Sequence, residues 1–138
     1  MANYRWSISE SDKPETLEQG SIRKEMIMET FDQFPWMDRV QKMADMKEEE
    51  IYFAPSLEFE NLDTTHAVCI SIIGDASKYE FYTFYRRPKT FKILGLFKKK
   101  LDKHLSEITG QTKEDAARLL KVFIDNNYEL MEKMMKKK

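Results

Sequence analysis

The chain has 138 residues, of which 41% are hydrophobic and 34% are charged, and its formal net charge is −1. This balance is typical of a globular protein and excludes disordered, collagen-like and low-complexity classes. The length suits one domain, so we expect residues 1–138 to form a single domain around one hydrophobic core.

The sequence contains no segment that suggests export or membrane insertion. Its longest apolar run, Ala67–Ile73, has the length of a strand and falls well short of the ~20 residues of a transmembrane helix. The first residues lack the apolar core of a signal peptide. The single cysteine, Cys69, cannot form an internal disulfide. We therefore expect a soluble, cytoplasmic protein without a transmembrane segment.

The small net charge hides a strong asymmetry along the chain. Residues 1–65 hold seven basic and fifteen acidic side chains, whereas residues 86–104 hold eight basic side chains and one acidic one. The remaining stretches are close to neutral. A partner can recognise such separated charge, because clustered side chains of one sign create a local field at the surface.

The first half of the chain predicts one strand followed by two helices. Apolar and polar residues alternate over Tyr4–Ser9, the period of a half-buried strand, and residues 10–20 are interpreted as a connection. Ser21 is a suitable helix N-cap, because apolar residues follow it at helical spacing. Pro35 suits the first turn of a second helix, whose apolar stripe runs to Ala44.

The middle of the chain is rich in strand signals. Residues 51–59 predict an edge strand or a bulged strand, because they contain Pro55. Both faces of His66–Ile73 are largely apolar, which predicts a central strand that is covered on both sides. After a short loop, aromatic residues recur along Tyr79–Arg87, and we expect Pro88 to end that strand.

The last third of the chain predicts a long helix. Residues 91–108 are ambiguous between helix and strand, and we interpret them as a loop followed by a short strand. Thr112 and Asp115 resemble a capping box, and the sustained apolar stripe behind them predicts a long C-terminal helix. Residues 125–127 are weak helix formers that can kink this helix.

Together these elements predict an α+β fold. An antiparallel β-meander of about four to five strands packs against the long C-terminal helix, and a helix pair is inserted after the first strand. This is the simplest arrangement that buries all of the apolar stripes together.

Residue types with catalytic chemistry are present, but they do not form a recognisable motif. His66 and His104 are the only histidines, and no serine lies in the sequence context of a nucleophile. Cys69 lies among apolar strand residues, where a thiol usually serves as a small buried hydrophobe. His66 and Cys69 point to opposite faces of a strand, so they cannot easily share a metal ion. We predict no catalytic, metal-binding or cofactor-binding residues, and an enzyme is the less favoured class.

One segment is a candidate binding surface. An aromatic strand runs directly into a basic cluster, and we expect Tyr82 and Phe84 to face the core so that the alternate residues face outward. Tyrosine and arginine are favoured anchors of protein interfaces. The predicted surface consists of Tyr79, Phe81, Tyr85, Arg86, Arg87, Lys89 and Lys92.

The favoured function is therefore a small non-catalytic binding module that uses this aromatic-basic surface for a protein partner or for self-association. Nucleic acid is disfavoured, because the chain is acidic overall and lacks an RNP-like motif. Contact of residues 91–100 with an anionic membrane is a further, less favoured hypothesis. A core strand followed by a solvated loop, without any binding role, explains the same segment.

The alternative from another class is a small-molecule-binding protein or an enzyme. Its pocket would lie between the sheet and the C-terminal helix. The residues expected to line that pocket are Tyr82, Phe84, Phe123 and Tyr128.

Overall fold

The computed structural model describes the backbone of residues 3–93 and 97–136 and, outside residues 89–103, their side chains. It has an α+β fold, as predicted, and its six antiparallel strands form one sheet in the order β2-β1-β3-β4-β5-β6. The prediction of four to five strands is thus too low.

The strands are β1 (Tyr4–Ser9), β2 (Leu17–Ile22), β3 (Ser56–Asn61), β4 (Ala67–Gly74), β5 (Tyr79–Ile93) and β6 (Phe97–Gln111). The helices are α1 (Lys24–Gln33), α2 (Trp36–Ala44), α3 (Lys113–Ile124) and α4 (Tyr128–Lys136), with a short 3-10 helix, η1 (Glu48–Glu50), before β3.

The strand that the sequence did not predict at the start of the chain is β2. Only its terminal residues, Leu17 and Ile22, are partly buried, so no apolar alternation marks it. Its backbone pairs with β1 at the edge of the sheet. The helix pair consequently follows the second strand rather than the first. Helix α1 begins at Lys24, and Ser21 pairs with Arg5 in the sheet instead of capping the helix.

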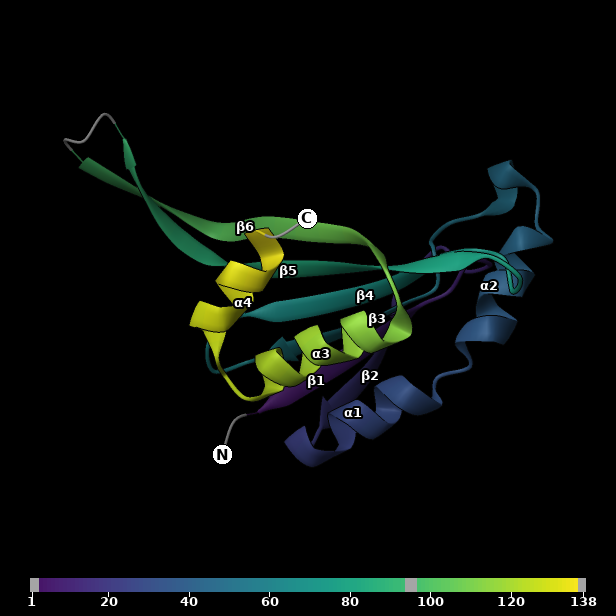
Figure 1. Cartoon of the computed structure of the whole chain (residues 1–138), viewed down its shortest axis with the longest axis horizontal. Coiled ribbons are helices and arrows are strands. Elements are labelled where there is room, and N and C mark those ends of the chain that lie inside the picture. The colour runs from purple at the N-terminus through teal and green to yellow at the C-terminus, as the bar shows by residue number, and fades with distance from the viewer. Residues whose placement is uncertain (1–2, 94–96, 137–138) are drawn as a thin grey trace.

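Strands β5 and β6 form a hairpin of two 15-residue strands. The prediction of a loop over much of residues 91–108 is therefore wrong, and β5 does not end at Pro88. The register of the hairpin shifts between Arg87 and Lys89, and proline is tolerated at such an irregularity because it cannot donate a ladder hydrogen bond. Figure 1 shows the distal part of the hairpin projecting beyond the rest of the molecule. We call residues 88–93 and 97–103 of this hairpin the arm.

The C-terminal segment forms two helices rather than one long helix. The predicted capping box is confirmed at the start of α3: the Thr112 hydroxyl accepts from the Asp115 backbone N–H, and the Asp115 carboxylate accepts from the Thr112 N–H, both at 3.1 Å. The predicted kink is a complete break, because Asn126 adopts a φ of +60°, a left-handed conformation that ends a helix. The following helix, α4, has only nine residues.

Helices α1, α3 and α4 lie over one face of the sheet, and α2 packs at the end of that face (Figure 1). On this face the fully buried Val68, Ile70 and Ile72 of β4 meet the helices, for example Leu119 and Phe123 of α3 in the same core cluster. No helix in the described part of the chain lies over the opposite face, which we call the open face. Strand β4 is central, as predicted. No helix in the described part of the chain covers its second face, although Ala67 and Ser71 on that face are buried by their neighbours.

Candidate binding surface

Alternate residues of β5 face opposite sides of the sheet. The set that faces the core is the one that the sequence predicted to face outward. Phe81 and Tyr85 have 0% exposure and lie in the core. They pair across β4 with Ile72 and Val68, which face the helices. Tyr82 and Phe84 are only partly buried and lie on the open face. The aromatic pattern occupies both faces of the strand, so the sequence contained no asymmetry by which to tell them apart.

Arg87 is also a core residue rather than a surface residue. Its Nε and Nη2 donate to the two carboxylate oxygens of Glu132 in α4, at 2.8 and 2.7 Å. Its Nη1 donates to the Tyr85 carbonyl and to the Ser106 hydroxyl, at 3.0 and 2.8 Å. The guanidinium carbon also lies 4.4 Å from the centre of the Tyr85 ring. With 2% exposure, Arg87 fastens α4 to the sheet.

A second polar contact holds α4 beside this ion pair. His66 Nδ1 lies 2.7 Å from the Tyr85 hydroxyl, and the His66 ring stacks on Tyr128 with ring centres 3.9 Å apart. Burial and the Arg87 charge lower the pKa of His66. Burial, together with the Glu132 charge, raises the pKa of Tyr85. Both side chains are thereby kept neutral near pH 7, which suits a packed hydrogen bond under α4.

The Tyr128 hydroxyl extends this network towards the β3–β4 turn. Asn61 Nδ2 donates to it at 3.1 Å, and the hydroxyl donates to the Asn126 side-chain oxygen at 3.0 Å. The Thr64 hydroxyl lies 3.1 Å away. Sequence reasoning missed this cluster, because its members are far apart in the chain and none belongs to a motif.

The remaining residues of the predicted surface lie outside the core. Tyr79 is 43% exposed at the start of β5. Arg86 lies on the open face, where its Nη2 is 3.0 Å from a Glu58 carboxylate oxygen. Lys89 and Lys92 lie in the arm, where their side chains fall outside the described part of the structure. The seven predicted residues are thus divided among the core, the open face and the arm.

The backbone register of the arm separates two sets of residues. Lys92 pairs with Lys98 and Thr90 with Lys100, so these four positions share one face of the hairpin. The intervening pairs lie on the other face, and they contain most of the apolar residues of the arm. These pairs are Lys89 with Leu101, Phe91 with Lys99, and Ile93 with Phe97.

The open face combines small residues at its centre with charged and apolar residues around them. One row across the sheet contains Arg5, Glu60, Ala67, Arg86 and Leu105. Glu60 lies 3.0 Å from Arg5, which gives a second ion pair beside Glu58–Arg86. Ala67 is almost fully buried between its neighbours, whereas Leu105 is 58% exposed.

Cys69 lies on the open face, but its chemistry does not suit a nucleophile. Burial, together with the Glu58 charge, raises the pKa of its thiol to about 11. The thiol is therefore protonated near pH 7, and the reactive species of cysteine is the thiolate. This agrees with its interpretation as a small hydrophobe.

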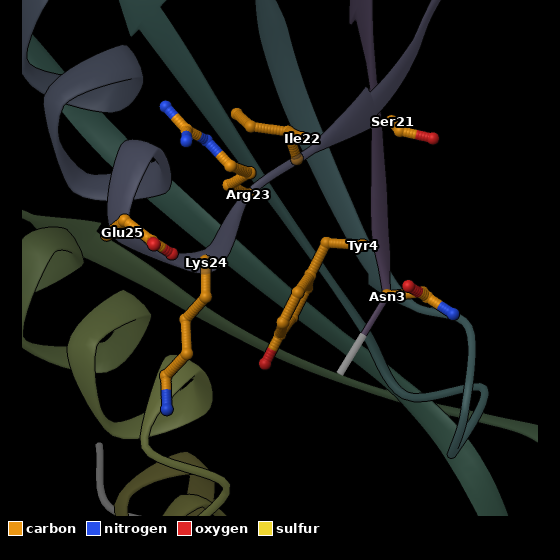
Figure 2. Close-up of a pocket in the computed structure, with 7 residues that line it drawn as sticks. All are labelled: Asn3, Tyr4, Ser21, Ile22, Arg23, Lys24 and Glu25. Atoms are coloured by element: carbon orange, nitrogen blue, oxygen red, sulfur yellow. The ribbon is translucent and has the colours of Figure 1, made fainter. Parts of the chain in front are cut away.

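A pocket of about 470 Å³ lies where β1, β2 and the start of α1 meet (Figure 2). Figure 2 shows Tyr4 and Lys24 extending in the same direction, while the Arg23 guanidinium points to another side. The Tyr4 hydroxyl already donates to Asn126, at 3.4 Å. No residue of the predicted binding surface lines this pocket. Sequence reasoning missed the pocket because it did not identify Leu17–Ile22 as a strand.

The residues expected to line a pocket between the sheet and the C-terminal helix do not meet. Tyr82 and Phe84 lie on the open face, whereas Phe123 is fully buried on the helix side. Tyr128 is partly buried on the helix side, where it stacks on His66. These four residues therefore do not line one common pocket.

Within residues 3–93 and 97–136, no helix combines the length and apolar character needed to cross a membrane. The described side chains also contain no group of three or more histidine, cysteine, aspartate or glutamate residues arranged to hold a metal ion. Comparisons of the chain with protein-family models, with curated proteins and with solved structures give no match.

Proposed function

We infer that the chain is a non-catalytic binding module that recognises proteins through the arm and the adjoining open face. The observation that carries this proposal is the arm itself, a hairpin that projects from the sheet (Figure 1) and whose register places Lys92, Lys98 and Lys100 on one face. A cationic projection of this kind favours encounter with an acidic protein surface.

The positions of the titratable groups also favour binding over catalysis. Tyr85 and His66 hydrogen bond to each other beneath α4, and Arg87 is engaged by Glu132. Cys69 has a raised thiol pKa of about 11. Groups with perturbed pKa values often mark active sites, but here Tyr85 and His66 contribute to packing between the sheet and α4, and the Cys69 thiol is protonated near pH 7.

The test uses a triple charge reversal in the arm, Lys92→Glu, Lys98→Glu and Lys100→Glu. We expect wild-type protein to be retained on immobilised poly-L-glutamate at low salt, and the variant to bind at least about tenfold more weakly. A matched control reverses three exposed lysines elsewhere: Lys24, Lys78 and Lys133. This control carries the same net charge as the arm variant. If the control is retained like the wild type, the weaker binding of the arm variant is due to the arm lysines.

Two results would overturn the proposal. Equal retention of the arm variant and the control would show that only net charge matters. Stronger binding of wild-type protein to single-stranded oligo-dT or to anionic phosphatidylserine vesicles than to poly-L-glutamate would favour nucleic acid or a membrane instead. Thermal unfolding of each variant checks that the sheet and its helices remain folded.

A further inference from the structure

We propose that the arm binds its partner by strand addition, in which an extended segment of alternating acidic and apolar residues pairs antiparallel with the free edge of β5. This inference rests on the proposed function and names the chemistry and the conformation of the partner. In strand addition the main-chain hydrogen bonds supply affinity, and the side chains on the two faces of the added strand supply specificity.

Strand β5 has a free edge within the arm. Its pairing with β4 ends at Arg86, opposite Ala67, whereas β5 itself continues to Ile93 with β6 on its other side. Among residues 3–93 and 97–136, no strand pairs with the β4 side of β5 beyond Arg86. An unpaired edge presents N–H and C=O groups that can template another strand.

The chain itself turns away from this edge. Immediately before Ala67 it bends back to β3, where the Asn61 N–H donates to the His66 carbonyl at 2.8 Å. The arm extends past this end of β4 (Figure 1). An added strand therefore takes the place in the sheet that lies in line with β4 and beyond its end.

The two-residue period of a strand assigns the groups on this edge. The His66 carbonyl faces β3, so the backbone groups of Ala67 face β5 and its partner there, Arg86. By the same alternation the groups of residues 88, 90 and 92 face the edge. The register shift near Pro88 places the extra residue on β6, so this alternation is not interrupted. Pro88 has no N–H, and Thr90 and Lys92 therefore supply the donors.

The register of the arm places positive charge beside this edge. Thr90 and Lys92 share a face with their β6 partners, Lys100 and Lys98. Like charges directly opposite each other, such as Lys92 and Lys98, destabilise a hairpin. Residues of an added strand that lie opposite Thr90 and Lys92 share the same face, so acidic residues there compensate this repulsion.

The other face of the arm favours apolar residues in the added strand. The positions on that face are Lys89, Phe91, Ile93, Phe97, Lys99 and Leu101. A residue between two acidic ones in the added strand lies on this face, beside Phe91. Alternation of acidic and apolar residues therefore matches both faces of the arm at once.

The far edge of β6 is the competing site. Strand β6 is the last strand of the sheet, so this edge also runs along the arm. It carries the consecutive lysines Lys98–Lys100, and lysines protect an edge against pairing. On β5 the first donor is Thr90, a β-branched residue that suits a paired strand. The observations therefore favour the β5 edge.

The first experiment uses a synthetic peptide of alternating glutamate and valine, long enough to span residues 88–93, and measures its affinity by isothermal titration calorimetry. We expect binding to the wild-type protein. A peptide of the same composition with its glutamates grouped cannot place them on one face, so it should bind at least about tenfold more weakly. Equal affinity of the two peptides, or no binding of the alternating one, overturns the proposal.

Backbone methylation of the alternating peptide tests strand addition itself. Residues that exchange hydrogen bonds across an antiparallel pair share a face, so the glutamates direct their N–H groups to β5. N-methylation of the glutamates should weaken binding at least about tenfold, because it removes these donors. N-methylation of the valines, whose N–H groups face solvent, should leave the affinity nearly unchanged. Equal affinities of the two methylated peptides overturn the proposal.

Variants at Thr90 test whether β5 provides the edge. Thr90→Pro removes an N–H that has no partner within the hairpin, and it should weaken binding of the alternating peptide at least about tenfold. Thr90→Val is the matched control, because it keeps the N–H and the branched shape, and it should bind like the wild type. Undiminished binding by Thr90→Pro overturns the β5 edge. Thermal unfolding checks both variants, and the methylated peptides test the same hydrogen bonds on the unaltered protein.

The failure of this inference can be distinguished from the failure of the proposed function. If the two methylated peptides bind equally while the triple charge reversal still weakens retention on poly-L-glutamate, the arm binds by charge alone. That result removes strand addition and leaves the binding module intact. If the triple reversal and its lysine control are retained equally, the proposed function is removed, and this inference with it.

Discussion

The two faces of β5 carry nearly the same chemistry and have opposite structural roles. Phe81, Tyr85 and Arg87 face the helices and are almost fully buried. Tyr82, Phe84 and Arg86 alternate with them on the open face and retain partial exposure. Each set therefore contains a phenylalanine, a tyrosine and an arginine. The comparison shows that residue type did not decide which set stabilises the fold; the position of the helices did.

The arginines show the difference most clearly. Arg87 makes two hydrogen bonds to one carboxylate and two more to β5 and β6, all within a site that excludes most water. Arg86 makes one ion pair, with Glu58, in which both side chains are about one-third exposed. Water screens the Arg86–Glu58 ion pair and competes for its hydrogen bonds, so this pair contributes little to stability.

The largest expected effect comes from removing an aromatic ring from each face. Phe81→Ala should lower the free energy of unfolding by about 4 kcal/mol, because it leaves a cavity next to Phe31 and Trp36. Phe84→Ala should cost only about 1 kcal/mol, because its ring is partly exposed. Urea unfolding followed by tryptophan fluorescence measures both values. Equal losses would contradict the separation of the two faces.

Substitution of Arg87 and of Arg86 should give the next largest difference in the free energy of unfolding. Arg87→Ala should cost about 3 kcal/mol, because it leaves the carboxylate of Glu132 without its bidentate partner. Arg86→Ala should cost less than about 1 kcal/mol. Arg87→Lys keeps the charge but loses the forked geometry, so it should recover only part of the loss. The same urea titration provides the measurement, and a milder effect at Arg87 than at Arg86 would refute the comparison.

The smallest effect is a dependence of stability on pH, and it belongs to the helix-covered face. His66 has a folded-state pKa below its usual value of 6.5, so the unfolded chain binds the proton more tightly. Stability should therefore be full above about pH 6.5 and should fall as the pH drops below that value. His66→Gln should flatten the pH dependence between pH 5 and 7. A loss that persists in His66→Gln would assign the titration to another group.

Several elements were predictable because their signals are local. The capping box at Thr112 and Asp115 needs only residues three apart, and it is present. The alternation over Tyr4–Ser9 and the apolar run of β4 likewise identified strands. Strand β2 was missed because most of its side chains are exposed and its stability comes from backbone pairing with β1. The arm was missed because lysine-rich residues resemble a solvated loop until their partners across the hairpin are known.

The candidate site was predictable only in part. Its basic character follows from composition, so Arg86, Lys89 and Lys92 were identified as members of a cationic segment. Phe81, Tyr85 and Arg87 were assigned to the surface, although they lie in the core. The contacts that hold them there, with Glu132, Ser106 and His66, join residues that are 19 to 45 positions apart.

By itself, the sequence determined the α+β class, the two-residue period of β5 and the separation of charge along the chain. These properties follow from the order of side chains, because strand and helix periods are local consequences of backbone geometry. Only the tertiary structure decided which half of the β5 alternation became core. Aromatic residues and arginine occupy both halves, so the choice depended on where α3 and α4 pack and on the Glu132 carboxylate that α4 brings to Arg87.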